Sequence, residues 1–235
     1  RCTPTPRIHG IERAFIDGPA ESDYAQIDEH GRYLVKLHFN ELEPSQAEGK
    51  RSTWIRMLQP HGGGSEGFHF PLRKNTEVAV AFMGGDPDRP AIVGVTPNAH
   101  NPSPVTHTNH TQNVVHTGGD NRIEIEDKDT KQYIDHSTPS KASWTHMGEP
   151  HGDHTHYFHK HTDGDEMIDI GGTRDIEVGG RQNEHVVDNV VERYDSSHNT
   201  VVKGLRIDTV VGSVLETYGS QVTNVKGTRI EGVKD

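Results

Sequence analysis

The residues with the most obvious capacity for chemistry form a histidine cluster in the second half of the chain. Five histidines fall within eleven residues: His151, His154, His156, His159 and His161. Neutral imidazole is a good ligand for zinc, nickel, copper and iron. Because His154/His156 and His159/His161 have i, i+2 spacing, each pair would lie on one face of a strand. In a three-fold assembly, one axial histidine from each chain would form a three-nitrogen metal site.

Two interpretations of this cluster stay open. In the first, the histidines hold an axial transition-metal ion that stiffens a shaft, and in the second they form a solvated polar insertion without a ligand. A metallohydrolase is an alternative function, but it would need further ligands at defined spacing and an open coordination position. The sequence has no HExxH motif. We therefore expect no certain cofactor, with an axial metal ion as the hypothesis to test.

Other catalytic motifs are weaker. Residues 62–67 match the pattern GxGxxG, but the run that follows is strand-like and is broken by Pro71. A dinucleotide site needs a helix there, so we interpret the glycines as a loop. Residues 63–67 also match the pattern GxSxG, but a nucleophile elbow needs a strand-to-helix turn, and the run that follows is strand-like. The sequence thus predicts that this chain is not an enzyme.

Composition excludes several classes of protein. The chain has 235 residues, of which 30% are hydrophobic, a single cysteine, and a net charge of −11. It contains no run of about 18 apolar residues, so we expect no membrane-spanning helix. The start at Arg1 shows neither a methionine nor an apolar leader, and we expect a piece of a longer protein. The acidic balance argues against nucleic acid as a partner.

The first hundred residues have the pattern of a small barrel. Short runs of strand-forming residues, separated by turn signals, occur at 8–16, 33–39, 54–58, 76–83 and 91–95. Five short strands without an intervening helix predict an antiparallel barrel over residues 1–97. An OB-type binding module is a further alternative function. Residues 1–100 hold 11 basic and 13 acidic residues, a charge of −2, which leaves −9 for the rest and disfavours an oligonucleotide groove.

The region after a proline-rich linker at 98–120 contains an internal repeat. From Asp165 the sequence divides into seven octads, then a seven-residue unit, then a final octad. The sixth position is apolar or aromatic in all seven: Ile170, Val178, Val186, Tyr194, Val202, Val210 and Tyr218. Glycine closes many units, at Gly172, Gly180, Gly204, Gly212 and Gly227. An octad suits one strand plus one turn, with glycine supplying the turn.

The repeat explains the low hydrophobic content. Each octad offers only two or three apolar side chains, too few for a core within one chain. Three intertwined chains would supply three inward-facing residues at every level. We therefore predict a homotrimer in which the sixth-position residues form the core and the glycines form the turns.

Several motifs in the barrel resemble the VgrG family of type VI secretion spikes and the related central spike of contractile phage tails. The stretches that carry the resemblance are residues 28–39, 54–56, 59–60, 67–71, 76–78 and 84–90, with a further strand at 121–127. The resemblance implies an all-β protein: an OB-fold barrel followed by an intertwined, trimeric, triple-stranded β-helix needle. The corresponding domains would be 1–97, a linker at 98–120, and a needle at 121–235 with a His-rich insertion around 137–164.

The resemblance also implies a function and partners. A member of this family would be a membrane-puncturing spike that sits on an Hcp tube, carries a PAAR-repeat tip protein, and delivers effector proteins through a target membrane. It would reside in the bacterial cytoplasm before firing and be secreted into the medium or the target cell. Its role would be mechanical, without catalysis in this segment.

Overall fold

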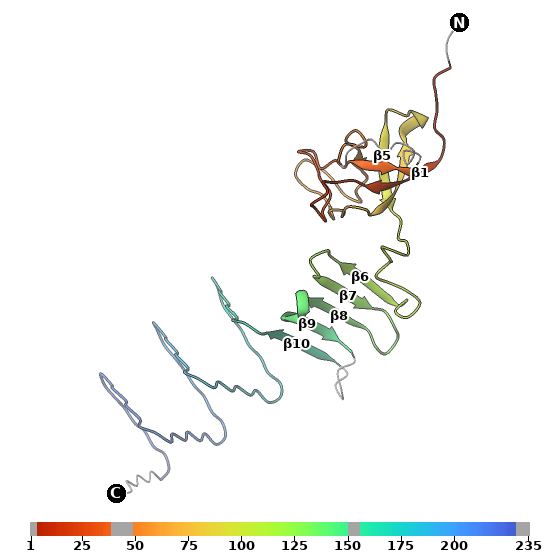
Figure 1. The fold of residues 1–235 in the computed structure, drawn as a ribbon. Coiled ribbons are helices and arrows are strands. Elements are labelled where there is room, and N and C mark those ends of the chain that lie inside the picture. Colours follow the sequence, from red (N-terminus) through yellow and green to blue (C-terminus); the bar gives the residue numbers. More distant parts are fainter. Residues whose placement is uncertain (1–3, 39–48, 150–155, 229–235) are drawn as a thin grey trace. The chain divides into compact units, whose positions relative to one another are not determined.

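The computed structural model describes residues 4–38, 49–149 and 156–228. The chain divides into two units, Arg1–Gly171 and Gly172–Asp235. The first unit contains two separate five-stranded sheets, and the described part of the second consists of extended chain interrupted by bends (Figure 1). The described residues thus form an all-β protein whose helices are limited to short 3-10 turns, among them η2 (Met83–Gly85) and η3 (Pro139–Lys141).

The first sheet contains the five strands predicted for the barrel. They are β1 (Ile11–Ile16), β2 (Val35–Leu37), β3 (Arg56–Met57), β4 (Glu77–Phe82) and β5 (Pro90–Val95), arranged in the order β2-β1-β4-β5-β3. All neighbouring pairs are antiparallel except β3 and β5. The result is a half-barrel sheet consistent with an OB domain.

The half-barrel has a closed hydrophobic core. Alternate residues of β4 point inward, so Val78 and Val80 are fully buried, and Ile92 on the paired strand β5 meets them. Tyr33 is also fully buried, and its hydroxyl accepts a hydrogen bond from the backbone N–H of Leu72. One chain therefore supplies all five strands of the sheet that surrounds this core.

The second sheet is an antiparallel meander. Its strands are β6 (Gln112–His116), β7 (Arg122–Glu126), β8 (Tyr133–Ser137), β9 (Ser143–Gly148) and β10 (Tyr157–Thr162), and the order follows the sequence. Strand β7 is the strand expected at 121–127. Strand β6 lies inside the stretch predicted as a linker, while β9 and β10 lie inside the predicted His-rich insertion.

Gly148 marks the end of β9 and is required there. Its φ is +122°, and a Cβ at this position would lie 2.4 Å from the carbonyl oxygen of Gln132 and 2.8 Å from Cα of Tyr133. A side chain would clash with the backbone of the neighbouring strand, so only glycine allows this close approach.

The chain beyond β10 follows the octad pattern. Extended runs of six residues alternate with two-residue bends at 163–164, 171–172, 179–180, 187–188, 195–196, 203–204 and 211–212. Within the second unit these runs form an open spiral whose successive turns stand apart (Figure 1). The described residues 163–228 contain no strand. The predicted β-helix needle, which requires three chains, therefore stays a prediction.

Candidate functional site

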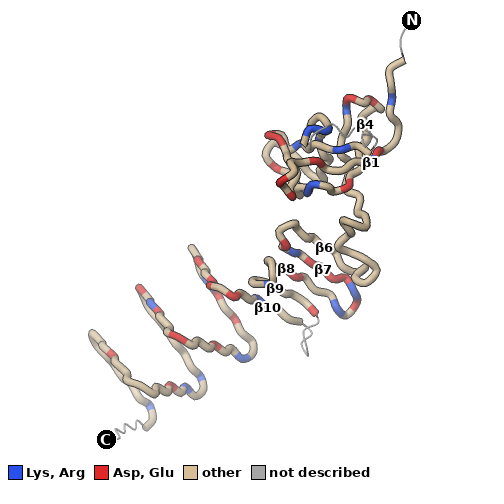
Figure 2. Tube along the Cα trace, viewed as in Figure 1, with Lys and Arg blue, Asp and Glu red and all other residues tan. Residues whose placement is uncertain are grey.

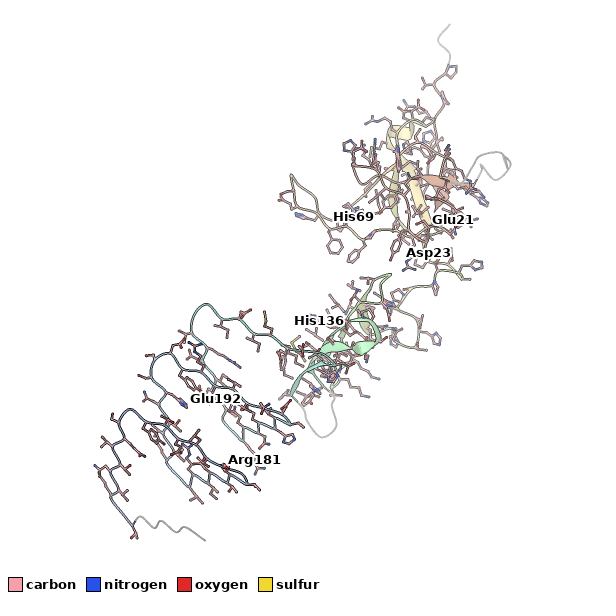
Figure 3. All side chains as sticks on the ribbon, turned by 60° about the vertical axis from the view of Figure 1, so that its left-hand side comes forward. Glu21, Asp23, His69, His136, Arg181 and Glu192 are labelled. Carbon is pink, nitrogen blue, oxygen red and sulfur yellow. The ribbon has the colours of Figure 1, made fainter. Side chains whose placement is uncertain are left out.

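The second sheet has one apolar face that the described residues leave exposed. The register places Ile125, Ile134, Met147 and Phe158 in one row across β7, β8, β9 and β10. Val115 and Ile123 form the adjoining row, together with His136, which Figure 3 labels. The side chains of Val115, Ile123, Ile125, Ile134 and Phe158 are 37–67% exposed. We call these residues and Met147 the apolar face, and its exposure marks it as an interaction surface.

The opposite face of the same sheet is polar and closely hydrogen-bonded. His146 is only 9% exposed, and its Nδ1 lies 2.5 Å from Oδ1 of Asp135 on the neighbouring strand. Arg122 Nε donates to Glu124 (2.7 Å), and the Tyr133 hydroxyl donates to the same carboxylate (2.9 Å). Burial and this carboxylate raise the pKa of Tyr133 to about 12. The polar face is thus held by hydrogen bonds among its own side chains, whereas the apolar face is exposed.

The structure describes three of the five predicted metal-binding histidines. His151 and His154 lie outside the described residues. His156 is exposed, 3.8 Å from a carboxylate oxygen of Glu149. His159 and His161 lie on the polar face, at register positions beside His146 and Trp144, with ring centroids 4.4 and 5.6 Å from the Trp144 ring. Among the described residues, no group of three or more His, Cys, Asp or Glu side chains could hold a metal ion.

Strand β10 has the same period as the octads that follow it. Its six residues precede the bend at 163–164, so residues 157–164 form an octad that ends in Gly164. Counting from the start of this unit, the even positions are Phe158, Lys160 and Thr162. Phe158 belongs to the apolar face, and Lys160 Nζ contacts the carboxylate of Glu166, an even position of the next octad. Even positions of β10 and of the first octad therefore lie on one side.

The same distinction between even and odd positions continues along the spiral. In the seven octads of residues 165–220, apolar and aromatic residues at even positions are 46–62% exposed, whereas those at odd positions are 74–100% exposed. The predicted trimer-core residues all belong to the first group: Ile170, Val178, Val186, Tyr194, Val202, Val210 and Tyr218. Because the structure contains one chain, the lower exposure of the even positions comes from the curvature of that chain. The even side is therefore the concave side of the spiral. Figure 3 shows side chains standing on both sides of a single layer of chain.

The bends coincide with the end of each repeat. Gly172, Gly180, Gly204, Gly212 and Gly227 all lie in them, and a Cβ at any of these five positions would meet nothing within 4 Å. The seven-residue unit shortens one interval, because the bends at 219 and 226–227 are closer than eight residues. Val225 nevertheless directly precedes its bend and is 46% exposed, like the sixth-position residues. The shorter unit thus keeps the apolar residue in place.

Polar residues on the even side pair with one another. Arg206 Nε donates to Asp208 (2.8 Å), and the Tyr218 hydroxyl donates to Glu216 (2.7 Å). This hydrogen bond raises the pKa of Tyr218 above its usual value, chiefly because the carboxylate stabilises the protonated phenol. Such pairing suits a side that is to be covered, because isolated charges are costly to bury.

Sequence reasoning did not identify the two faces of the second sheet. A usable signal exists in the strict alternation of residues 122–126, where Ile123 and Ile125 separate three charged residues. The Asp135–His146 contact depends on the register of two strands, which only the structure supplies. None of the helices in the described residues has the length and apolar character needed to cross a membrane.

Comparison with known proteins identifies a family that matches the half-barrel and several relatives of the chain. Residues 25–96 match the family of type VI secretion system/phage-baseplate injector OB domains. The chain is 37% identical over 137 residues to the actin cross-linking toxin VgrG1 of Vibrio cholerae, covering 56% of this chain and 12% of that protein. It is 33% identical over 138 residues to the type VI secretion system spike protein VgrG5 of Pseudomonas aeruginosa, covering 56% and 17%. For VgrG1a of the same organism the identity is 37% over 102 residues, covering 43% and 15%.

Proposed function

Because this chain is related to the VgrG-family spike proteins, we propose that it is a segment of the homotrimeric spike of a type VI secretion machine. The chain spans 12–17% of the length of these relatives, so the activity of the whole protein is part of the proposal. In this proposal the OB domain forms a collar, and residues 121–235 wind with two further copies into a triple-stranded β-helix needle.

The observation that carries the proposal is the unpaired spiral. Its extended runs have strand-like sequences and regular bends, yet no backbone partner is found for them within the described part of the chain. Backbone N–H and C=O groups on a strand require partners, and apolar side chains require cover. The open turns leave room for other strands, and two further copies would provide both.

Three-fold symmetry gives a specific pairing. If each bend carries the chain to the next of three faces, an octad lies beside the preceding octad of a neighbouring copy. Every extended run is then paired above and below, and the assembly has no lateral sheet edge. The even-side residues, such as Ile170 and Val202, face the axis, and we propose that the apolar face of the second sheet also does so.

The histidines take a different place in this trimer. His159 and His161 are odd positions of β10, and therefore face outward together with the polar face. An axial metal ion at these two residues is not part of the proposal. We infer that the chain acts mechanically, with no catalysis in this segment, and neither the metallohydrolase nor the OB binding module is favoured by an observation.

The proposed partners are those that the family resemblance implies. The spike would stand on an Hcp tube, carry a PAAR-repeat tip protein and effector proteins, and contact a target membrane. It would be held in the bacterial cytoplasm before firing and then be secreted. Two of the relatives carry the words "spike protein" in their names, which supports this role.

The test is the mass of the purified chain in solution. Light scattering after size-exclusion chromatography should give three times the 26.1 kDa mass of the chain, and the trimer should resist dilution. The same preparation, run unheated in sodium dodecyl sulfate, should migrate as a trimer that dissociates on boiling. A stable, folded monomer at micromolar concentration would overturn the proposal, because the even-side residues would then have no cover.

A further inference from the structure

A cavity opens on the polar face of the second sheet. Its volume is about 480 Å³, within the ~300–1,000 Å³ range typical of small-molecule sites. Two neighbouring rows of side chains from β7, β8 and β9 line it: Glu124, Asp135 and His146 in one row, and Arg122, Ser137 and Trp144 in the other. All of these residues belong to one chain. The cavity therefore does not depend on the proposed trimer, in which the polar face would be on the outside.

The turn between β8 and β9 adds Lys141 to the lining of the cavity. Ser140 and Lys141 both have left-handed backbone conformations, with φ of 57° and 55°. Two successive residues other than glycine rarely adopt this conformation. Thr138 closes the turn: its hydroxyl accepts a hydrogen bond from the backbone N–H of Ser143 (3.0 Å), and its carbonyl oxygen accepts one from that of Lys141 (3.0 Å). The lysine is thus held at the cavity in a conformation that glycine would adopt at lower cost.

The formal charges around the cavity cancel. Arg122 and Lys141 supply two positive charges, and Glu124 and Asp135 supply two negative ones. Figure 2 shows residues of both signs on the second sheet. An anionic or a cationic ligand would bring an unbalanced charge into a half-buried site, which is unfavourable. The charge balance therefore favours an uncharged ligand.

The polar groups of the cavity still have capacity for hydrogen bonds. Both oxygens of Glu124 are engaged, one by Arg122 and the other by the hydroxyl of Tyr133. Within the described part of the chain, other groups of the cavity have no hydrogen-bond partner: Lys141 Nζ, Ser137 Oγ, Trp144 Nε1 and Asp135 Oδ2. The first three can donate, and the carboxylate oxygen can accept. A matching ligand needs several oxygen acceptors and at least one hydroxyl donor.

Trp144 adds an apolar surface to these polar groups. Its ring is half-buried, and the rings of His159 and His161 on β10 hold it, with centroids 4.4 and 5.6 Å away. A sugar ring has C–H groups on its faces, which pack on an aromatic side chain, and hydroxyl groups around its edge. We propose that this cavity binds a neutral saccharide. The proposal goes beyond the spike function and does not rest on it.

Saturation-transfer NMR on the full chain tests the proposal. The probes are neutral trisaccharides of glucose, mannose, galactose and N-acetylglucosamine, each at millimolar concentration. At least one should receive saturation from the protein. Its affinity is then measured from the emission of Trp144 in a Trp54→Phe background. The chitosan trimer, which is the N-acetylglucosamine trimer without its acetyl groups and is cationic, and trigalacturonic acid, which is anionic, should bind at least about tenfold more weakly than the best neutral probe.

Variants of two side chains without a partner in the described structure locate the site. Ser137→Ala and Lys141→Gln should each weaken binding of that saccharide about three- to tenfold, because each removes a hydrogen bond to the ligand. Lys131→Gln is the matched control. This lysine is exposed at the other end of β8 and does not line the cavity, so its variant should bind as the wild type does. An unchanged thermal transition shows that each variant is folded.

The outcomes separate this inference from the proposed function. The saccharide site is overturned if no neutral trisaccharide receives saturation, or if Ser137→Ala and Lys141→Gln both bind with wild-type affinity. A charged trisaccharide that binds as tightly as the neutral ones also overturns it, because the charge balance would then not select the ligand. The mass of the same preparations is measured independently. A monomer that binds the saccharide overturns the spike alone, and a trimer that does not bind it overturns the saccharide site alone.

Discussion

The half-barrel and the spiral use the same strand-forming residues with opposite results. In the half-barrel, Val80 and Ile92 are fully buried, because β4 is flanked by β1 and β5 of the same chain. In the spiral, Val178 and Val202 are 47% and 49% exposed, because each extended run leads onward to another bend. An apolar side chain on a strand therefore forms a core only where a partner strand is provided. Where the chain does not return, another copy must provide it.

The largest expected effect comes from a charge on the concave side of the spiral. Val202→Asp would place three carboxylates around the axis of the trimer, and an uncompensated buried charge costs about 3–5 kcal/mol in each chain. We expect the trimer to dissociate, as measured by light scattering and by the loss of its thermal transition.

The neighbouring residue is the matched control. Val201 has the same side chain but lies at an odd position and is 85% exposed. Val201→Asp should leave the trimer mass unchanged. If the Val202→Asp trimer melted at the wild-type temperature, the even positions would not face the axis, and the contrast between the two regions would fail.

The next effect concerns the core that one chain closes alone. Ile92→Ala in the half-barrel should lower the free energy of unfolding by about 2–5 kcal/mol, because it leaves a cavity. The loss should not depend on protein concentration, unlike that of an assembly. Trp54 fluorescence during denaturation in a Trp144→Phe background measures it.

Val95 provides a control on the same strand β5. It is 48% exposed, so Val95→Ala should cost less than about 1 kcal/mol. If the denaturation midpoint of Ile92→Ala depended on protein concentration, the half-barrel core would also be shared between chains. The half-barrel and the spiral would then not differ in how their cores form.

The smallest effect is a pH dependence of the second sheet. The pKa of Tyr133 is raised to about 12, so its protonated form is favoured in the folded state. Its contribution to stability should be present below pH 10 and be lost as the pH rises from about 10 through about 12. Denaturation midpoints between pH 9 and 12 measure this loss.

Tyr133→Phe should flatten that part of the pH profile. The absorbance difference between wild type and variant during an alkaline titration isolates this one phenol from Tyr194 and Tyr218. A difference curve centred at the ordinary pKa of tyrosine would show that the polar face is open to water, as the spiral is, and would contradict the contact with Glu124.

Local signals were sufficient to predict the half-barrel strands and the repeat. Alternation at residues 33–39 and 76–83 follows from the two-residue period of a strand, and the sixth-position residues recur visibly in the sequence. The bends at 163–164, 171–172 and onward to 211–212 recur at the same eight-residue interval. These features depend on residues that are close together in the sequence, so the sequence alone is enough to predict them.

Features that depend on register were not predictable. Residues 112–116 are preceded by a proline-rich stretch and carry little apolar pattern, so β6 was included in a linker. The polar face joins residues from five strands, and its Asp135–His146 contact requires a known pairing of β8 with β9.

The repeat also determines which changes in length the shaft can accept. In the proposed trimer, deletion of one whole octad, such as residues 189–196, moves everything after it to the next face. Three-fold symmetry makes that face equivalent, so all later pairings are restored and the needle is one strand shorter. A deletion of four residues would instead place bends opposite extended runs. Insertion or deletion of whole octads would therefore lengthen or shorten the needle by one strand at a time, with no change to the sequences at its two ends.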